Sequence, residues 1–244
     1  MSLEGRGIVV TRPRELAHGL ARLIENAGGR AFIFPAIQID DLPAPAALRR
    51  LETFDLAVFI SPTAVAKVMR HHPQWPPRLR AAAVGAGTRR ELEARGVAAV
   101  MAPDSAADSE ALLALPELEH MAGKRVVIFR GEGGRALLGN ALSARGAAVE
   151  YAECYRRTRP RTDAAPLLAA WSGIHAVTVS SEEGLENLFA LLGAPGEARL
   201  QAAPMFVGHE RVAARARQLG VREAMVAGPG DGEMLERLVA YFRR

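Results

Sequence analysis

Length, composition and charge exclude several classes of protein. The chain has 244 residues, of which 49% are hydrophobic, so it can form one large or two small packed domains. The basic residues behind its net charge of +4 are almost all arginine, but no basic cluster is interleaved with aromatic residues, which argues against a nucleic-acid partner. A single cysteine, Cys154, excludes a disulfide framework. We expect a cytoplasmic protein without a signal peptide or membrane span, because no apolar run reaches about 18 residues.

Short apolar runs alternate with helical patterns along the whole chain. In chain order, these patterns predict a strand at residues 8–10, a helix at 16–27, strands at 56–60 and 126–129, a helix at 137–142 and a strand at 176–179. Glycine follows both helices, at Gly28 and Gly146, as is common at helix ends. Alternating strands and helices indicate a mainly parallel sheet with helices on both faces.

The chain also contains an internal duplication. Residues 5–28 align without a gap with residues 123–146, and LAVFISPTAV from Leu56 corresponds to HAVTVSSEEG from His175. AVGAGTRRELEARGV from Ala83 then corresponds to FVGHERVAARARQLGV from Phe206, and a segment near Ala102 resembles one near Ala227. Because these landmarks recur in the same order, we predict two similar α/β domains.

Ligands of such sheets bind in the loops that follow the carboxyl ends of the strands. The loops in question are residues 11–13, 61–63, 85–88, 130–134, 180–181 and 208–209. All six occupy the same topological place, so we expect them to share one cleft.

The loop at residues 130–134 reads Arg-Gly-Glu-Gly-Gly between a predicted strand and a predicted helix. It lacks the third glycine of a dinucleotide fingerprint and the Gly-Lys-Ser/Thr of a phosphate-binding loop. One interpretation is a nest of backbone amides, flanked by Arg130 and Arg135, that binds a carboxylate. The alternative is a tight turn in which glycine is needed for a positive φ.

Three polar side chains at these positions also have structural explanations. Thr88-Arg89-Arg90-Glu91 has the pattern of a capping box, and Ser61 and Ser181 can likewise begin helices. Tyr155 ends an alternating, extended segment and could simply anchor a strand. Its neighbour Cys154 should face the other way as a small buried hydrophobe.

Taken together, these segments resemble the uroporphyrinogen-III synthase family. The motifs that carry the resemblance are VTRP from Val10, SPTAV from Ser61, Val84-Gly85 with Thr88, AGKRVVIFRGEGGRALL from Ala122 and ARGAAVEYAECYRR from Ala144. The resemblance covers most of the chain and rests on the order and spacing of these motifs. It implies two doubly wound parallel-sheet domains with a cleft between them. Domain 1 would be residues 1–36 plus 162–244, domain 2 residues 40–155, and two extended linkers would lie at 36–42 and 155–162.

The implied substrate is hydroxymethylbilane, a linear tetrapyrrole with an acetate and a propionate on each ring. The implied reaction closes this chain with loss of water and inverts ring D, giving uroporphyrinogen III. The residues expected to bind the substrate are Thr11, Arg12, Ser61, Pro62, Thr63, Ala64, Gly85, Thr88, Arg130, Gly131, Gly133, Gly134, Ser180, Ser181 and Gly208.

By the family's pattern, Tyr155 would be the catalytic proton donor, because a phenol, with a pKa of about 10, is protonated at neutral pH. No cofactor or metal is expected. The expected partners are the small-molecule substrate and a transient handover from the preceding pathway enzyme, with a monomer as the working state. The sequence departs from the pattern at Arg211, where a hydroxyl is common, so Arg211 is not assigned to the site.

Two other functions are compatible with the same sequence. One is a non-catalytic, two-lobed regulatory module that binds a tetrapyrrole or another polyanion. The other is a nucleotide-sugar or dinucleotide enzyme on a doubly wound fold, for which the imperfect glycine pattern is a poor match.

Overall fold

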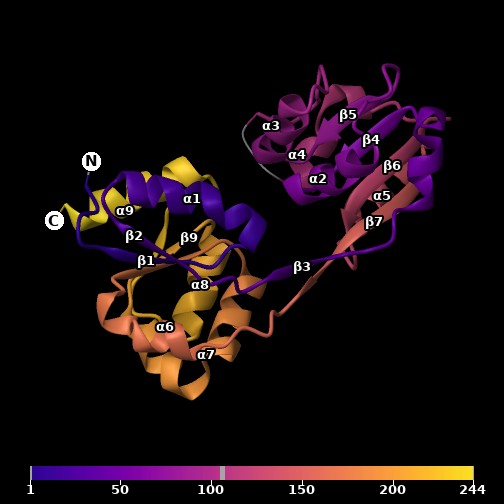
Figure 1. Cartoon of the computed structure of the whole chain (residues 1–244). Helices are drawn as coiled ribbons and strands as arrows, with labels where there is room; N and C mark the ends of the chain where they lie inside the picture. The colour runs from indigo at the N-terminus through magenta and orange to yellow at the C-terminus, as the bar shows by residue number, and fades with distance from the viewer. Residues whose placement is uncertain (1, 105–107, 244) are drawn as a thin grey trace. The chain divides into compact units, whose positions relative to one another are not determined.

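The two halves of the sequence repeat are divided between two units of the structure. The computed structural model describes residues 2–104 and 108–243 (Figure 1). Unit 1 comprises Met1–Ile39 and Thr158–Arg244, and unit 2 comprises Asp40–Arg157. The repeat landmark near Ala102 extends over residues 105–107, which lie outside the described part of the chain. The segments 36–42 and 155–162 contain strand β3 and the end of strand β7.

Unit 1 is built around a five-stranded sheet in the order β10-β9-β8-β1-β2, with all four neighbouring pairs parallel. Its elements are β1 (Gly7–Val10), α1 (Arg14–Asn26), β2 (Arg30–Ile33), α6 (Ala165–Ala169), η3 (Trp171–Gly173), β8 (Ala176–Val179), α7 (Glu182–Ala202), β9 (Met205–Val207), α8 (Glu210–Gln218), β10 (Ala224–Val226) and α9 (Asp231–Phe242).

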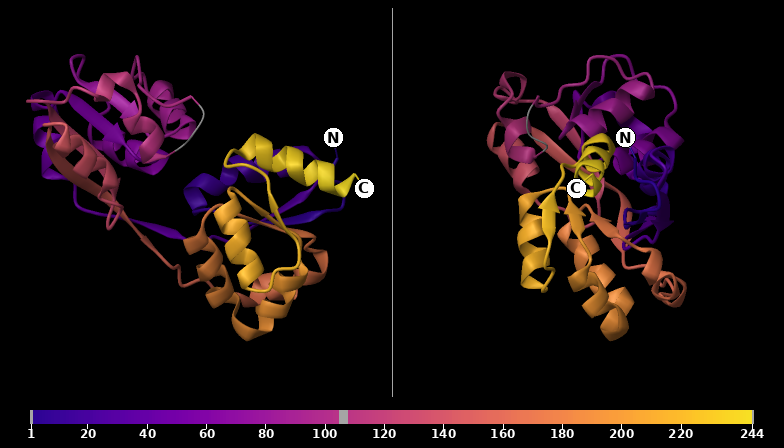
Figure 2. Two further views of the ribbon diagram at one scale, coloured as in Figure 1. Left: turned by 180° about the vertical axis from the view of Figure 1, so that it is seen from behind. Right: turned by 90° about the vertical axis from the view of Figure 1, so that its left-hand side faces the viewer.

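Alternation along β1 explains why helices cover both faces of this sheet. Val9 belongs to one buried cluster, which includes Leu188 of α7 and Ala213 of α8. Ile8, one residue earlier, belongs to a second cluster with Leu238 of α9. Successive side chains of a strand point to opposite faces, so an apolar run here requires cover on both sides. Figures 1 and 2 show α1 and α9 on one side of the sheet and α7 and α8 on the other.

Unit 2 contains a second five-stranded sheet, in the order β3-β7-β6-β4-β5, whose pairs β7–β6, β6–β4 and β4–β5 are parallel. Its elements are β3 (Gln38–Asp41), η1 (Ala46–Thr53), β4 (Leu56–Phe59), α2 (Pro62–His71), β5 (Arg80–Ala83), α3 (Ala86–Ala94), α4 (Ser109–Leu113), η2 (Pro116–Leu118), β6 (Arg125–Gly131), α5 (Leu137–Ala144) and β7 (Ala148–Thr158). The prediction of an α/β fold with parallel sheets is confirmed.

The repeat and the units do not coincide. In the repeat, β1-α1-β2 corresponds to β6-α5-β7, and β8 and β9 correspond to β4 and β5. The order β9-β8-β1-β2 in unit 1 therefore matches β5-β4-β6-β7 in unit 2. Each unit thus combines the first part of one copy with the second part of the other copy. The units have the same strand order although their segments occur in different orders along the chain.

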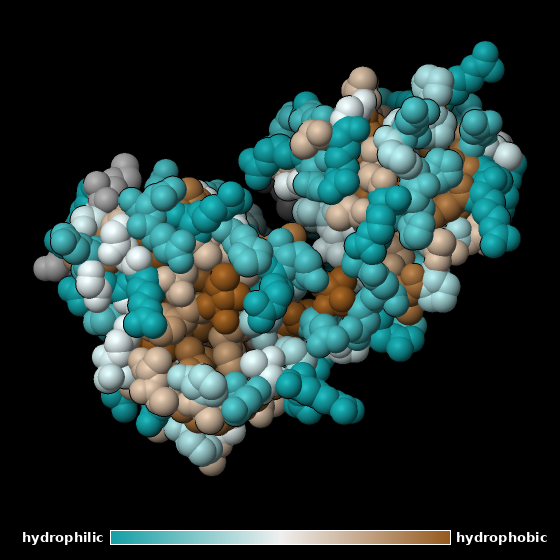
Figure 3. Space-filling model, viewed as in Figure 1, coloured by the Kyte–Doolittle hydropathy of each residue, from teal (hydrophilic) through white to brown (hydrophobic). Residues whose placement is uncertain are grey.

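Hydrophilic side chains cover most of the face shown in Figure 3, with hydrophobic residues visible in patches. Among the residues that the structure describes, no helix combines the length and the apolar composition that crossing a membrane requires.

We predict that Gly7→Ala destabilises unit 1. A Cβ at Gly7 would lie 2.0 Å from the carbonyl oxygen of Gly173 and 2.8 Å from Cε2 of Phe32, so backbone would have to move. Overpacking of this kind typically costs about 1–3 kcal/mol of unfolding free energy. Gly173→Ala is the matched control, because its added Cβ would meet no atom within 4 Å. Urea unfolding should show a lower midpoint for Gly7→Ala than for Gly173→Ala, and equal midpoints would contradict the prediction.

Candidate functional site

Two helices of unit 2 begin side by side where strands β4 and β5 end. Ser61 is the N-cap of α2, and its Oγ accepts a hydrogen bond from the Ala64 amide at 3.1 Å. Gly85 is the N-cap of α3. A Cβ at Gly87 would lie 3.9 Å from Cγ of Pro62, so the first turns of the two helices are close neighbours. Both turns present backbone amides that lack intrahelical acceptors, together with the positive ends of two helix dipoles.

Tyr155 on β7 reaches the first of these helix starts. Its Oη lies 2.9 Å from Ser61 Oγ, and the residue is only 4% exposed. A shift in the β6–β7 register after Arg130 places Tyr155 opposite Gly131. A side chain at Gly131 would meet the phenol ring, since its Cβ would lie 2.8 Å from Tyr155 Cε2. The ring is therefore held between the end of β6 and the start of α2.

The three glycines at the end of β6 and in the turn that follows have different roles. Gly131 leaves room for the ring of Tyr155. Gly133 has a φ of +73°, a conformation that L side chains rarely adopt. A Cβ at Gly134 would lie 3.2 Å from Cζ of Arg130. The structural explanation of this glycine-rich turn is therefore correct at Gly133, whereas the other two glycines allow close packing.

The guanidinium of Arg130 holds this turn together. Its Nε donates to the Gly131 carbonyl at 3.2 Å, its Nη1 to the Arg135 carbonyl at 3.3 Å, and its Nη2 to the Gly134 carbonyl. Nε also lies 3.7 Å from the carboxylate of Glu153, which accepts from the Gly133 amide at 3.2 Å. The side chain of Arg130 is 8% exposed. Its observed partners belong to the protein, so direct contact between Arg130 and an anion stays a prediction.

We predict that Arg130→Met destabilises unit 2 by roughly 1–3 kcal/mol, because it removes the donor to one buried and two partly buried hydrogen bonds of the turn. Arg135→Met is the matched control, since the Arg135 side chain is 66% exposed and its carboxylate partner, Glu110, lies 3.6 Å away. In thermal unfolding, Arg130→Met should have a clearly lower melting temperature than Arg135→Met. Equal melting temperatures would show that the Arg130 hydrogen bonds contribute nothing to stability.

The capping-box interpretation of Thr88 is wrong. Helix α3 begins at Ala86 with Gly85 as its N-cap, so Thr88 lies inside the first turn. Its amide donates to the Gly85 carbonyl at 3.0 Å, and the residue is 4% exposed. Only two residues separate the end of β5 from the helix, which starts earlier than the capping pattern predicted. The expected role of Thr88 in substrate binding is a separate hypothesis and stays a prediction.

The corresponding loops of unit 1 gather at the carboxyl ends of β1, β8 and β9. Thr11 donates from Oγ1 to the Thr178 carbonyl at 2.7 Å. Ser181 is the N-cap of α7 and accepts from the Gly184 amide at 3.1 Å, just as Ser61 caps α2. A Cβ at Gly208 would lie 3.6 Å from the Ser180 carbonyl oxygen. These loops are therefore neighbours at one edge of the unit 1 sheet.

Arg12 has a partner that local sequence patterns do not indicate. Its Nη1 forms an ion pair with Asp231, the first residue of α9, and its Nη2 donates to the Pro229 carbonyl at 2.8 Å. An acidic residue in the first turn of a helix is a common feature, but the pairing itself joins residues far apart in the sequence. Asp231 thus fixes the guanidinium of Arg12 beside the unit 1 loops.

The structure also shows the surroundings of Arg211, which is exposed, and of Cys154, which is buried. Arg211 lies 3.3 Å from the carboxylate of Glu182, and its side chain is 71% exposed. Cys154 is buried, as predicted, and burial raises the pKa of its thiol to about 12. The thiol therefore stays protonated and takes no part in nucleophilic chemistry at neutral pH.

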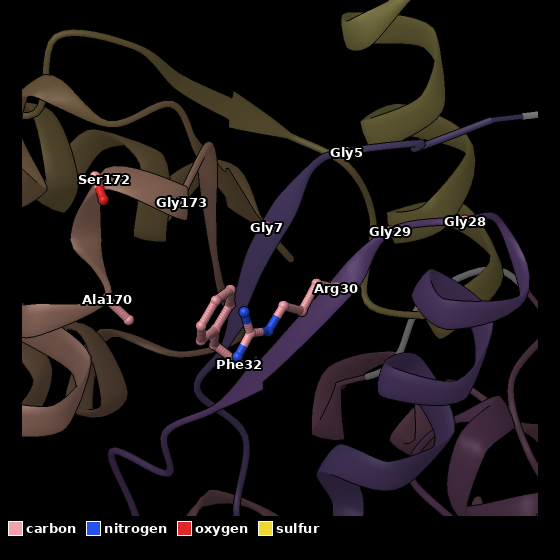
Figure 4. A pocket seen from close by; sticks show the side chains of 9 residues that line it. All are labelled: Gly5, Gly7, Gly28, Gly29, Arg30, Phe32, Ala170, Ser172 and Gly173. Atoms are coloured by element: carbon pink, nitrogen blue, oxygen red, sulfur yellow. The ribbon is translucent and has the colours of Figure 1, made fainter.

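A hollow of about 440 Å³ lies at the amino ends of the unit 1 strands, opposite the loops described above (Figure 4). Its walls include Gly7 and Gly29, at the amino ends of β1 and β2, and the guanidinium of Arg30 stacks 4.6 Å above the ring of Phe32. Ligands of parallel α/β sheets bind at the carboxyl ends of strands, so we do not assign this hollow to the candidate site.

Comparisons with known proteins identify the family. A family model described as uroporphyrinogen-III synthase HemD matches residues 18–236. The uroporphyrinogen-III synthases of Salmonella typhimurium and Escherichia coli are 36% and 35% identical over 241 residues, in each case covering 94% of this chain and 98% of the relative.

Solved structures of similar fold carry the same name. A mutant uroporphyrinogen III synthase from Thermus thermophilus matches with a TM-score of 0.61 at 20% identity, over 98% of this chain and 99% of that one. The enzyme from Helicobacter pylori matches with a TM-score of 0.62 at 12% identity over the full length of both chains. At these identities the likeness supports the fold, while the family model and the bacterial relatives show that this chain belongs to the uroporphyrinogen-III synthase family.

Proposed function

We propose that this chain catalyses the reaction of its family, the cyclisation of hydroxymethylbilane to uroporphyrinogen III with loss of water and inversion of ring D. The observation that carries the proposal at the level of the site is the hydrogen bond between the buried Tyr155 and the half-buried Ser61, at 2.9 Å, beside the starts of two helices. A proton donor and anion-binding amides are what an acidic substrate with a hydroxyl leaving group requires.

The substrate carboxylates would be bound mainly by backbone amides. In unit 2 the donors would be the amides of Thr63 in the first turn of α2, of Ala86 and Gly87 in the first turn of α3, and of Gly134 in the turn after β6. The amides of Ala64, Thr88 and Gly133 already donate within the protein. In unit 1 the donors would lie in the loops at Thr11-Arg12, Ser180-Ser181 and Gly208. Arg12, fixed by Asp231, would add a positive charge to the unit 1 set.

Tyr155 would act as the general acid that releases water. Electrons from the pyrrole nitrogen expel the terminal hydroxyl group, the C–O bond breaks, and the phenol gives its proton to the departing oxygen. The electrophilic azafulvene that results is attacked by ring D through its already substituted carbon, giving a spiro intermediate. Rearrangement inverts ring D, and the proton lost as the pyrrole regains its aromaticity returns to the tyrosinate.

The protein otherwise acts by orientation. Unguided ring closure would join the two ends of the linear tetrapyrrole directly, so the enzyme has to select one folded conformation of a flexible molecule. Fixing reacting groups in this way can lower a barrier by several kcal/mol. Backbone amides suffice for this role, and the mechanism uses no cofactor. We propose that the enzyme works as a cytoplasmic monomer that receives its substrate from the preceding pathway enzyme.

Isomer analysis of the product tests the proposed function directly. The purified protein is incubated with hydroxymethylbilane, the products are oxidised, and the type I and type III porphyrins are separated. Type III porphyrin in excess over a protein-free control is the expected result. Type I porphyrin alone would overturn the proposal and favour a module that merely binds tetrapyrroles.

A further inference from the structure

We infer that Ser61 is a positioning residue for Tyr155, acting on the proton donor rather than on the substrate. The inference rests on the proposed function and deepens it. Its basis is the 2.9 Å hydrogen bond between Ser61 Oγ and Tyr155 Oη, combined with the role of Ser61 as N-cap of α2.

The N-cap hydrogen bond limits what the Ser61 hydroxyl can do. A serine hydroxyl has one proton and two acceptor lone pairs. One lone pair accepts the Ala64 amide at 3.1 Å. The proton and the second lone pair of Ser61 can each pair with Tyr155 Oη at 2.9 Å. Donation by Ser61 is the direction that leaves the phenol proton free to point toward the leaving hydroxyl, and it is the direction that remains once Tyr155 has lost its proton.

The same hydrogen bond becomes stronger when Tyr155 gives up its proton. The tyrosinate oxygen is then a charged acceptor, and hydrogen bonds to charged groups are shorter and roughly twice as strong as neutral ones. Ser61 also stands at the positive end of the α2 dipole, which further stabilises a negative charge at this point. The hydrogen bond therefore stabilises the tyrosinate more than it stabilises the neutral phenol. An interaction that strengthens as proton transfer proceeds lowers the barrier of that step.

Packing keeps the phenol in the position that this hydrogen bond needs. Gly131 lies against the ring, and the Glu132 amide donates to the Tyr155 carbonyl at 2.8 Å. The charged groups next to Tyr155 have partners of their own. Arg156 pairs with Glu132, with Nη2 at 2.8 Å from Oε1, and Arg130 is engaged with carbonyl groups of its turn. Among the described residues, Ser61 is thus the group placed to orient the hydroxyl.

A double-mutant cycle tests the inference. The variants are Ser61→Ala, Tyr155→Phe and the two together, with Ser61→Thr as the conservative replacement that keeps both the cap and the hydroxyl. We expect Ser61→Ala to lower kcat about fivefold to tenfold with little change in KM, as the loss of one hydrogen bond predicts. In the Tyr155→Phe background, Ser61→Ala should lower kcat by less than about twofold. Ser61→Thr alone should have a kcat close to that of the wild type.

Loss of the helix cap is controlled separately. Asp108 caps α4 through a 2.7 Å hydrogen bond from the Ala111 amide, so Asp108→Ala removes a cap in the same unit. It should lower stability without changing kcat. Effects of Ser61→Ala and Tyr155→Phe that simply multiply, or a KM that rises with kcat unchanged, would overturn the inference and make Ser61 a substrate ligand.

A spectroscopic measurement separates this inference from the proposed function. The wild-type minus Tyr155→Phe difference isolates the tyrosinate absorbance of Tyr155 during an alkaline titration. The transition should move to higher pH in Ser61→Ala, because the anion loses its donor. An unmoved transition would overturn the inference whatever the activity. If the wild-type protein forms no type III porphyrin but the transition moves, the proposed function fails while the coupling of the two side chains is upheld.

Discussion

Tyr155→Phe is expected to lower kcat for uroporphyrinogen III formation by about a hundredfold, at the lower end of what a positioned proton donor contributes. The rate should not fall to zero, because the amide loops still fold the substrate and the azafulvene can still form with water as the acid. KM should change little, since phenylalanine keeps the ring that packs against Gly131. The type III fraction should fall as unguided closure competes with the slower enzyme.

Tyr151→Phe is the matched control for this prediction. Tyr151 lies on the same strand, is 38% exposed, and its hydroxyl donates to the Ala136 carbonyl at 3.1 Å. Removing that hydroxyl also deletes one hydrogen bond from β7 but leaves the Tyr155–Ser61 pair in place. We expect near wild-type kcat for Tyr151→Phe. Full activity in Tyr155→Phe would remove the catalytic role from this residue.

Strands β1, β4, β6 and β8 could be predicted from the sequence because they are buried on both faces. The run at residues 126–129 lies within β6, and the run at 176–179 coincides with β8. Every residue of β8 is buried, so the whole strand is apolar or, at Thr178, has its hydroxyl bonded to the Val9 carbonyl. Helix α1 is likewise indicated by its repeating apolar face, since helical spacing directly reflects burial.

Side-chain pairings within the candidate site could not be predicted from local patterns. Ser61 and Tyr155 are 94 residues apart, and their hydrogen bond depends on the shift in register between β6 and β7. The ion pair between Arg12 and Asp231 joins the two ends of the chain. The glycine-rich turn and its arginines indicated an anion site, but only the fold reveals that Arg130 bonds to the turn itself.

The exchange of segments between the repeat copies leads to a second strong prediction. A fragment comprising residues 40–157 should fold by itself, whereas residues 1–122, one full copy of the sequence repeat, should not. The first fragment contains the whole β7-β6-β4-β5 sheet and its helices. The second lacks β6, which pairs with both β4 and β7, and it also lacks β8, the neighbour of β1.

The physical reason is the loss of apolar contacts at the centre of each sheet. Without β6, Val58 of β4 loses contact with Ile128 and Leu142, which complete the buried cluster on one face of the sheet. Without β8 and α9, Ile8 of β1 is left without Ala176 and Leu238. Each exposed side chain of this size forfeits roughly 1.5–3 kcal/mol of burial energy, and domains have only about 5–15 kcal/mol of net stability.

Circular dichroism and urea unfolding of the two fragments check this prediction. The fragment of residues 40–157 should show a cooperative unfolding transition. For residues 1–122, the circular dichroism signal should change gradually with urea and show no cooperative transition. Adding residues 123–157 to the second fragment should restore a cooperative transition, because β6 and β7 complete the unit 2 sheet. A cooperative transition for residues 1–122 alone would mean that the repeat copy is itself a folding unit. The shared strand order would then not require segments from both copies.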